Sequence, residues 1–299
     1  MKHISKNSKI LSVSLNDFDA VVSQIILGHV FKDITYLNAS FYNIDSIMES
    51  IEYDKYDFVF LTDISPTNIS LLNLSENIIL LDHHESAIEA NNPSKMHFVI
   101  SGHCAAYLTK KFVKKYYDLE LKHLDDLVRL CDDYDMWNLK YPESKLINDL
   151  MFYRYRPKKF RELFFDGRIT FTEDEQNWLD ERAKEFTRLY HSLAVFEFEK
   201  INGCVVESKE FINEICDRLM SENEEKYEIV FCRNPVHGRV SIRHKIEGLN
   251  MGEILKNKGW GGGHFFSCGM FVNDVNDFKK KIEILEEIIF KHINNYKIL

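Results

Sequence analysis

The first 85 residues alternate short apolar runs with amphipathic stretches, and this pattern constrains the fold more than any other feature of the chain. Four apolar runs have the length of buried strands: residues 10–15, 34–37, 58–61 and 78–81. Helical patterns at residues 20–31 and 44–52 separate the first three runs. Strands that alternate with helices predict a parallel sheet with helices on both faces, which places this half of the chain in the α/β class.

The remainder of the chain predicts a second, smaller α/β domain. Helical patterns continue at residues 105–117 and 121–131, and a long helical run covers residues 173–193. Strand-like runs return at residues 204–206, 228–231 and 239–243, with helical patterns at 213–220 and 274–293. We therefore predict a parallel-sheet domain at 1–150, a helical connector at 151–198 and a smaller C-terminal α/β domain at 199–299.

Composition excludes several classes of protein. Apolar residues make up 45% of the chain, and 38 basic against 47 acidic residues give a net charge of -9. Proteins that grip long duplexes are usually basic, so this balance favours a short or small substrate, although an acidic surface explains it equally well. The six cysteines form no C-x-x-C pair, and no apolar run has the length of a membrane span. We expect a soluble, cytoplasmic protein without membrane contact.

Acidic residues and histidines follow three of the four apolar runs directly. They are Asp17 and Asp19, then Asp63, then Asp82, His83 and His84. The carboxyl ends of parallel strands meet at one edge of a sheet, where α/β proteins place their working sites. Carboxylates gathered there repel one another and need a cation, and oxygen ligands with an imidazole suit manganese or magnesium. Two such ions can activate water against a phosphorus centre.

Each of these motifs alone has an ordinary structural explanation. An Asp-x-Asp pair after a strand is often a turn or a helix cap, and Asp63 before Ser65-Pro66 could start a turn. The acidic cluster at residues 132–135 could be a solvated helix end, although acids there oppose the helix dipole. Their recurrence at successive strand ends of one predicted sheet favours a shared site.

Six motifs give the chain a resemblance to a known family. The segment LLDHHES resembles the signature motif of the DHH phosphoesterase superfamily, and NDFD, FLTD and CDDYDMW resemble its other acidic motifs, in the family's order. Near the C-terminus, GWGGGHFFSCGMF and the upstream RVSIR resemble the GGGH motif and the arginine strand of the DHH-associated domain. The resemblance covers nearly the whole chain and is greatest to the oligoribonuclease branch, which degrades nanoRNA from an end.

The resemblance implies a role for each residue of the first motifs. Two metal ions, Mn²⁺ with Mg²⁺ as the alternative, would be held by Asp17, Asp19, Asp63, His83 and one aspartate of 132–135, with Asp133 the first choice and Asp135 the second. Asp63 would bridge the ions and His84 would lie near the phosphate and the leaving oxygen. Asp82 would orient a histidine. Two positions depart from the family: Leu15 stands where a histidine is common, and Ala20 where a glycine is usual.

The glycine run near the C-terminus predicts a substrate-binding site. Glycines allow close approach of the backbone to a ligand, so Gly261, Gly262 and Gly263, with His264 and Arg243, would bind the nucleotide. The alternative for the run is a flexible turn. A basic stretch at residues 154–161 could contact a nucleic-acid backbone or form a solvated helix face.

These observations predict a metal-dependent phosphodiesterase or exonuclease that hydrolyses short RNA or DNA oligonucleotides. A cyclic nucleotide, a cyclic dinucleotide or a nucleoside bisphosphate is the alternative substrate. A nucleotide-binding protein with a degenerate metal site is the alternative from another class, and Leu15 is the residue that keeps it open. The sequence leaves open whether the chain acts alone or as a homodimer.

Overall fold

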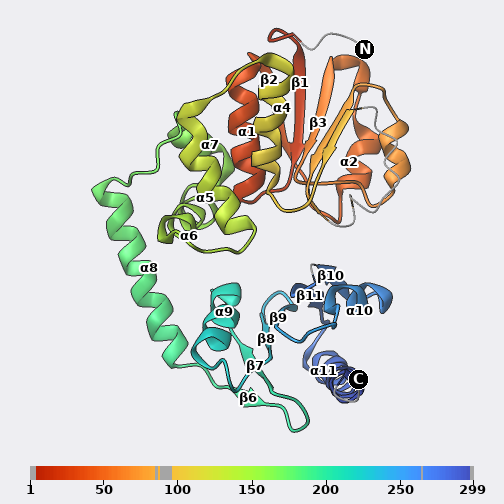
Figure 1. The fold of residues 1–299 in the computed structure, drawn as a ribbon, viewed down its shortest axis with the longest axis vertical. Coiled ribbons are helices and arrows are strands. Elements are labelled where there is room, and N and C mark those ends of the chain that lie inside the picture. The colour runs from red at the N-terminus through yellow and green to blue at the C-terminus, as the bar shows by residue number, and fades with distance from the viewer. Residues whose placement is uncertain (1–4, 85–86, 88–95, 264, 297–299) are drawn as a thin grey trace. The chain divides into compact units, whose positions relative to one another are not determined.

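The computed structural model describes residues 5–84, 87, 96–263 and 265–296 of the chain (Figure 1). Its internal contacts divide the chain into two compact units, residues 1–179 and residues 180–299. We call them the first unit and the second unit. The borders predicted at 150 and 198 stay a prediction, while the contacts assign residues 151–179 to the first unit.

A five-stranded sheet forms the centre of the first unit. Its strands are β1 (Lys9–Ser14), β2 (Asp33–Asn38), β3 (Phe58–Thr62), β4 (Ile78–Asp82) and β5 (Met96–Val99). They lie in the order β2-β1-β3-β4-β5, and all four pairs are parallel. The parallel sheet predicted from the apolar runs is therefore confirmed. Strand β5, with the sequence MHFV, was not predicted because its four residues lack a continuous apolar run.

Alternate residues of the strands point to opposite faces of this sheet, and each face carries its own core. Phe58 and Phe60 pack beneath α1 (Phe18–Val30), α4 (Ala105–Tyr117), α5 (Asp125–Asp135) and α7 (Arg156–Phe164). Val59 and Leu61 pack on the other side, against α2 (Ile44–Ser50) and the 3-10 helix η2 (Ile69–Asn73). Helices thus cover both faces, as expected for a doubly wound sheet.

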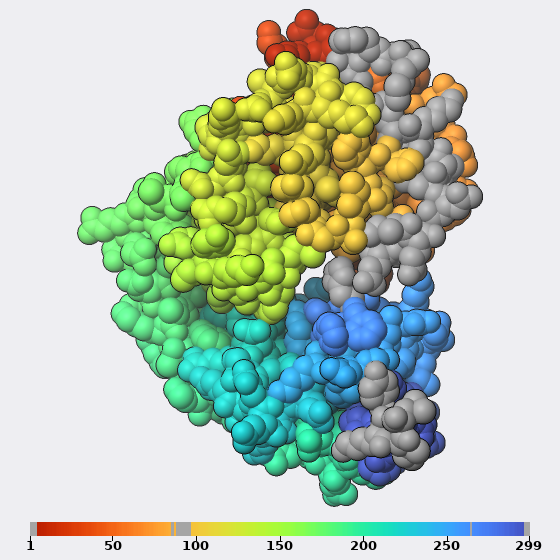
Figure 2. Space-filling model, in the orientation of Figure 1, coloured from red at the N-terminus to blue at the C-terminus, as the bar shows by residue number. Residues whose placement is uncertain are grey.

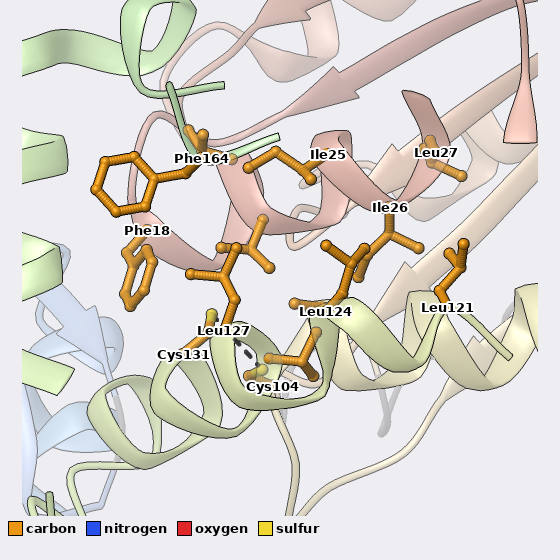
Figure 3. Close-up of a cluster of buried hydrophobic side chains, with 14 of the residues drawn as sticks. Phe18, Ile25, Ile26, Leu27, Cys104, Leu121, Leu124, Leu127, Cys131 and Phe164 are labelled. Atoms are coloured by element: carbon orange, nitrogen blue, oxygen red, sulfur yellow. Dashed lines mark hydrogen bonds between the residues drawn. The ribbon is translucent and has the colours of Figure 1, made fainter. Parts of the chain in front are cut away.

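Helix α1 lies between the sheet and a further layer of helices. Most of its residues are buried, so it is apolar on nearly every side. Figure 3 shows Ile26 of α1 next to Leu124 of the turn before α5, and Ile25 and Leu127 of α5 belong to the same buried cluster. The outer sides of α4 and α5 form part of the surface of the first unit (Figure 2).

The remaining elements of the first unit are short. They are η1 (Tyr53–Lys55), η3 (Lys122–Leu124), α6 (Pro142–Asp149) and the π-helix η4 (Leu150–Tyr155). The long helix α8 (Glu173–His191) contains the border between the two units. None of the helices in the described ranges combines the length and apolarity that crossing a membrane requires.

A six-stranded mixed sheet organises the second unit, in the order β10-β11-β9-β8-β7-β6. The strands are β6 (Phe196–Glu197), β7 (Gly203–Glu207), β8 (Ile229–Arg233), β9 (Arg239–His244), β10 (Gly261–Gly263) and β11 (Ser267–Phe271). Helix α9 (Ile212–Glu222) covers one face. Helices α10 (Met251–Asn257) and α11 (Val275–Tyr296) cover the other. The prediction of a smaller C-terminal α/β unit is confirmed.

Candidate metal centre and nucleotide-binding face

The acidic residues of the first unit follow neighbouring strands. The strand ends are in register, with Ser14 opposite Thr62 and Thr62 opposite Leu81. Asp63 continues this pairing, because its backbone N–H donates to the Leu81 carbonyl at 3.0 Å. Asp17 begins α1 immediately after β1 and accepts the N–H of Ala20 at 3.0 Å. The parallel register therefore brings together carboxylates that lie far apart in the sequence.

His83 Nε2 lies among three carboxylates. It is 3.2 Å from Asp63 Oδ1, 3.4 Å from Asp135 Oδ2 and 3.8 Å from Asp19 Oδ2. The His83 side chain is 4% exposed, so little water reaches this point. Ligand atoms at neighbouring positions of an octahedral Mg²⁺ shell are about 3 Å apart, given bonds of about 2.1 Å. The ligand atoms of Asp19, His83 and Asp135 all lie within 4.8 Å of one another, a spacing that suits a shared divalent cation, and Asp63 joins His83 in a second such group with Asp82 and His84.

Two buried carboxylate oxygens of this cluster accept no hydrogen bond from any described residue. They are Asp63 Oδ2 and Asp135 Oδ2. Burial raises the pKa of Asp63 well above its ordinary value, and the negative charges of Asp17 and Asp19 raise it further. Burial and the charge of Asp19 likewise raise the pKa of Asp135. A bound cation would compensate buried oxygens without donors and charges that repel one another, so the donor set fits the metals that the resemblance implies.

The histidine of the cluster is suited to bind metal. Burial lowers the pKa of His83, although the carboxylate of Asp19 acts in the opposite direction. A neutral imidazole is the form that ligates a metal. Asp63 has a backbone φ of 59°, in the left-handed region that aspartate and asparagine tolerate better than most residues. Such backbone geometry often marks a residue that the surrounding fold holds in place for a function.

Asp19 is held by the first turn of α4. Its Oδ2 accepts the N–H of Ala105 at 2.6 Å, and its Oδ1 accepts the N–H of Ala106 at 2.6 Å. The Cys131 thiol donates to Oδ1 at 3.6 Å, and Cys104 lies next to it with the two sulfur atoms 3.9 Å apart (Figure 3). The N-terminus of a helix stabilises negative charge, which explains how this carboxylate is accommodated in the interior.

Asp82 orients His84. Its Oδ1 accepts the Nδ1–H of His84 at 2.7 Å and the backbone N–H of His83 at 2.8 Å, and its Oδ2 accepts the hydroxyl of Ser65 at 2.5 Å. Burial raises the pKa of Asp82, but the hydrogen bonds from His84 and Ser65 and the charges of the two histidines together outweigh it, so the pKa is lowered. Burial opposes protonation of His84, yet the bond to Asp82 and the negative charges of Asp82, Asp17 and Asp19 together raise its pKa. The sequence contains no motif that would have identified Ser65 as a partner.

The three aspartates at the end of α5 have different partners. Asp135, the second choice from the sequence, is the member that lies beside His83. Asp133, the first choice, instead accepts the backbone N–H groups of Lys140 and Tyr141 at 3.0 and 3.1 Å and so holds the loop after the helix. Residues two apart on a helix differ by about 200° in direction, so the two side chains cannot serve the same place. Asp132 Oδ1 accepts the backbone N–H of Cys104, just before α4, at 2.7 Å.

Leu15 supplies no metal ligand. Its side chain packs against the apolar cluster on the α2 face of the sheet, at the position where the family commonly has a histidine. The neighbouring Asn16 is exposed, and its Oδ1 accepts a hydrogen bond from Asn38 at 3.0 Å. Ala20 is fully buried in α1. The candidate ligands of the centre are therefore the carboxylates and His83.

Two of the three glycines in β10 are required by close strand packing. A Cβ at Gly261 would lie 2.0 Å from the Gly269 carbonyl oxygen, and one at Gly263 would lie 2.6 Å from Cys268 Cα. At Gly262, by contrast, a Cβ would meet only the Gly252 oxygen at 3.9 Å. Packing against the described residues does not require glycine at this position, which is compatible with close approach of a ligand.

Gly262 lies on the same face of the sheet as the small residues Gly269 and Ser241 and as Arg243, and we call it the small-residue face. Gly262 pairs with Gly269 and Gly269 with Ser241, and directly paired residues share a face of the sheet. Arg243 lies two residues beyond Ser241 on β9, and its guanidinium donates to Ser241 Oγ at 3.2 Å and to Asn213 Oδ1 of α9 at 3.2 Å. The predicted residue His264 lies outside the described residues.

The basic stretch at residues 154–161 is partly engaged within the first unit. Arg154 pairs with Asp174 at 2.5 Å, and Arg161 bonds to Gln24 and lies over the Tyr36 ring. Lys158 and Lys159 are exposed on α7. Two of the arginines thus stabilise the fold, while the contact with a nucleic-acid backbone stays a prediction.

No protein-family model matches the chain, and neither does any curated protein. Several solved structures share its fold. The pGpG-specific phosphodiesterase PggH from Vibrio cholerae has a TM-score of 0.56 at 14% identity, over 96% of this chain and 99% of PggH. RecJ from Thermus thermophilus, solved with Mn²⁺, has a TM-score of 0.54 at 15% identity, over 94% of this chain and 52% of RecJ. An exopolyphosphatase-related protein from Bacteroides fragilis has a TM-score of 0.50 at 13% identity, over 95% and 94%.

These similarities establish the fold. The chain has the fold of the DHH phosphoesterases, as the order of its motifs predicted. It spans about half the length of RecJ and nearly the full length of PggH. The oligoribonuclease branch stays a prediction.

Proposed function

We propose that the chain is a metal-dependent phosphodiesterase that hydrolyses linear dinucleotides and very short oligonucleotides. The observation that carries this proposal is the convergence of Asp63, Asp135 and Asp19 on His83 Nε2, at 3.2 to 3.8 Å. A bound cation would compensate the repulsion within such a group of buried carboxylates around an imidazole, and the group lies at the carboxyl ends of the strands, where α/β enzymes act.

The ions would be held by Asp17, Asp19, Asp63, His83 and Asp135. Two divalent cations, Mn²⁺ in the first place, would acidify a water molecule and polarise the phosphoryl group. Asp19 keeps its carboxylate in place through the two N–H donors of α4, so the centre is organised before substrate binds.

His84 would act on the substrate and not on the metals. Asp82 accepts its Nδ1–H, so Nε2 is the nitrogen directed away from Asp82. Because the bond to Asp82 favours the protonated ring, His84 can donate a hydrogen bond to a phosphoryl oxygen and a proton to the leaving oxygen. Ser65 fixes the second oxygen of Asp82 and thereby the direction of the ring.

The small-residue face of the second unit would hold the nucleotide. Arg243 supplies a positive charge, and Gly262 allows a phosphate or sugar to approach the backbone. Linear dinucleotides are the first choice of substrate because PggH, which is described as pGpG-specific, matches over almost its full length. A cyclic dinucleotide or a nucleoside bisphosphate keeps the same chemistry and is the first alternative.

A nucleotide-binding protein without turnover is the alternative from another class. The observation in its favour is Leu15, which packs into the apolar core and supplies no ligand where the family commonly has a histidine. Loss of one ligand weakens a metal site, and this enzyme would then need a higher metal concentration or would bind nucleotide without cleaving it.

One experiment separates these alternatives. Purified protein is incubated with labelled pGpG, a longer oligonucleotide, a cyclic dinucleotide and a bisphosphate, each with Mn²⁺, with Mg²⁺ and with excess chelator. The Asp63→Asn variant is the matched control, since it changes one ligand atom. We expect metal-dependent turnover of the linear dinucleotide by the wild type only. Turnover in chelator would contradict the metal mechanism, and nucleotide binding without turnover at any metal concentration would establish the binding protein.

A further inference from the structure

The turn between β2 and α2, residues 39–43, is anchored at both ends. Ala39 is buried and its N–H donates to the Ser14 carbonyl at 2.7 Å, at the end of β1. Ile44 is fully buried at the start of α2. Within the turn, Asn43 Oδ1 accepts the N–H of Ser40 at 2.7 Å and its hydroxyl at 2.9 Å. The turn therefore has a defined position at the edge of the sheet where the metal centre lies.

This anchored turn presents two aromatic side chains to solvent. Phe41 is 53% exposed and Tyr42 is 76% exposed, although the residues on either side of them are built into the core or into hydrogen bonds. The Phe41 ring lies edge-on to the His84 ring, with the centroids 5.6 Å apart and an interplanar angle of 83°. A large apolar ring is thus held in water beside the histidine that is proposed to act on the phosphate.

The chemistry of the turn points to a base and not to a phosphate. Its five residues, Ala-Ser-Phe-Tyr-Asn, carry no charge. An exposed aromatic ring gains little from water but stacks on any nucleobase, because every base has a π-face. The proposed metal centre would attract the phosphate, and the Phe41 ring lies 5.6 Å from the ring of His84 beside it, so the adjoining nucleoside would lie next to Phe41.

We propose that Phe41 is the platform on which the base next to the scissile phosphate stacks, so that the substrate must bear a base at this position. This inference rests on the proposed phosphodiesterase function and narrows it. Inorganic polyphosphate and abasic phosphodiesters would be poor substrates, because they leave Phe41 without a partner. Phe41 would position the substrate and would take no part in proton transfer.

The test compares pGpG with its two singly abasic analogues, in Mn²⁺. Variants are Phe41→Ala, Phe41→Trp, which keeps a stacking ring, and Leu74→Ala. Leu74 is 49% exposed but precedes β4, at the opposite edge of the sheet, and so is the matched control. For Phe41→Ala we expect kcat/KM for pGpG to fall about 5- to 150-fold, the range of one base–aromatic stack. Phe41→Ala and the wild type should have the same kcat/KM for one abasic analogue, the one that lacks the stacked base. Phe41→Trp and Leu74→Ala should have the kcat/KM of the wild type for pGpG.

Two results would overturn the inference while leaving the enzyme intact. One is equal kcat/KM of wild type and Phe41→Ala for pGpG. The other is that Phe41→Ala lowers kcat/KM for both abasic analogues as much as for pGpG, which would mean that the substitution has a general structural effect. If the wild type cleaves none of these substrates, the proposed function fails. Binding of a dinucleotide that contains the fluorescent base 2-aminopurine, measured in Mg²⁺, then tests the stacking on Phe41 without any turnover. Quenching of its fluorescence by wild type but not by Phe41→Ala supports the platform, and any other pattern excludes it.

Discussion

Asp19 and Ala105 lie 86 positions apart in the sequence, yet the Asp19 carboxylate accepts the Ala105 backbone N–H at 2.6 Å. A proposed metal ligand thus also caps a helix of the fold. The first turn of α4 leaves its N–H groups without partners inside the helix, and Asp19 satisfies two of them. The centre and the packing of α4 on α1 are consequently not independent.

Asp19→Ala should therefore destabilise the protein even without metal. Two buried N–H donors would lose a charged acceptor, which costs about 1–3 kcal/mol of unfolding free energy. Urea unfolding in excess chelator measures this. Asp135→Ala is the matched control from the same cluster, because Asp135 Oδ2 has no donor among the described residues and its carboxylate lies at the C-terminal end of α5. Equal losses in the two variants would contradict the capping role of Asp19.

Asp63→Asn should abolish activity but raise the melting temperature of the metal-free protein. The change removes one negative charge from a buried group of carboxylates, and asparagine tolerates the left-handed backbone at φ 59°. In chelator we expect the melting temperature to rise by about 2–4 °C for each kcal/mol of relieved repulsion. Mn²⁺ should raise the melting temperature of the wild type but hardly that of the variant. A wild type insensitive to Mn²⁺ would refute the metal centre, and so would a variant with full activity.

Glu175→Gln should lower stability at neutral pH and lose this effect in acid. Bonds from Arg168 lower the pKa of Glu175 to about 2, and Glu175 also accepts the N–H of Thr172 at 2.7 Å in a capping box at the start of α8. A carboxyl group whose pKa is lower in the folded chain stabilises the fold above its ordinary pKa near 4.5. That contribution disappears as the pH falls from about 4.5 towards about 2.

The measurement is chemical unfolding of wild type and Glu175→Gln between about pH 7 and about pH 3. We expect a difference of about 1–3 kcal/mol at pH 7 that narrows below the ordinary pKa of the carboxyl group. Glu173→Gln controls for charge in the same helical turn, since Glu173 is exposed. A pH-independent difference would mean that the capping geometry, and not the charge, provides the stability.

Much of the fold could be predicted because apolar runs and strand ends are local features. The strands at residues 10–15 and 58–61, and the acids that follow them, needed no knowledge of distant contacts. The choice between Asp133 and Asp135 required knowledge of distant contacts, because it depends on the direction in which α5 meets the sheet. The carboxylate of Asp133 is occupied by the loop at Lys140 and Tyr141, and that loop has no recognisable motif.

The partners of the site residues were the least predictable part. Backbone N–H groups carry no sequence signal, so the support that Ala105 and Ala106 give to Asp19 is visible only in three dimensions. Phe41 looks like an ordinary core residue in the sequence, because aromatic residues are usually buried. Its exposure beside His84 follows from the turn that precedes α2. None of these relationships has a recognisable pattern in the sequence.

The glycine run allows a test in which two adjacent residues should respond differently. Gly261→Ala would place a methyl group 2.0 Å from the Gly269 carbonyl oxygen, so it should destabilise the second unit by about 1–3 kcal/mol or more. Gly262→Ala meets nothing closer than 3.9 Å and should leave stability unchanged. If the face around Arg243 holds the nucleotide, however, the new methyl group would displace it and lower kcat/KM for pGpG about 10- to 100-fold. Thermal unfolding and kinetics of both variants measure these effects. A Gly262→Ala variant with the stability and the kcat/KM of the wild type would show that no ligand approaches this strand, and the glycine run would then be explained by strand packing alone.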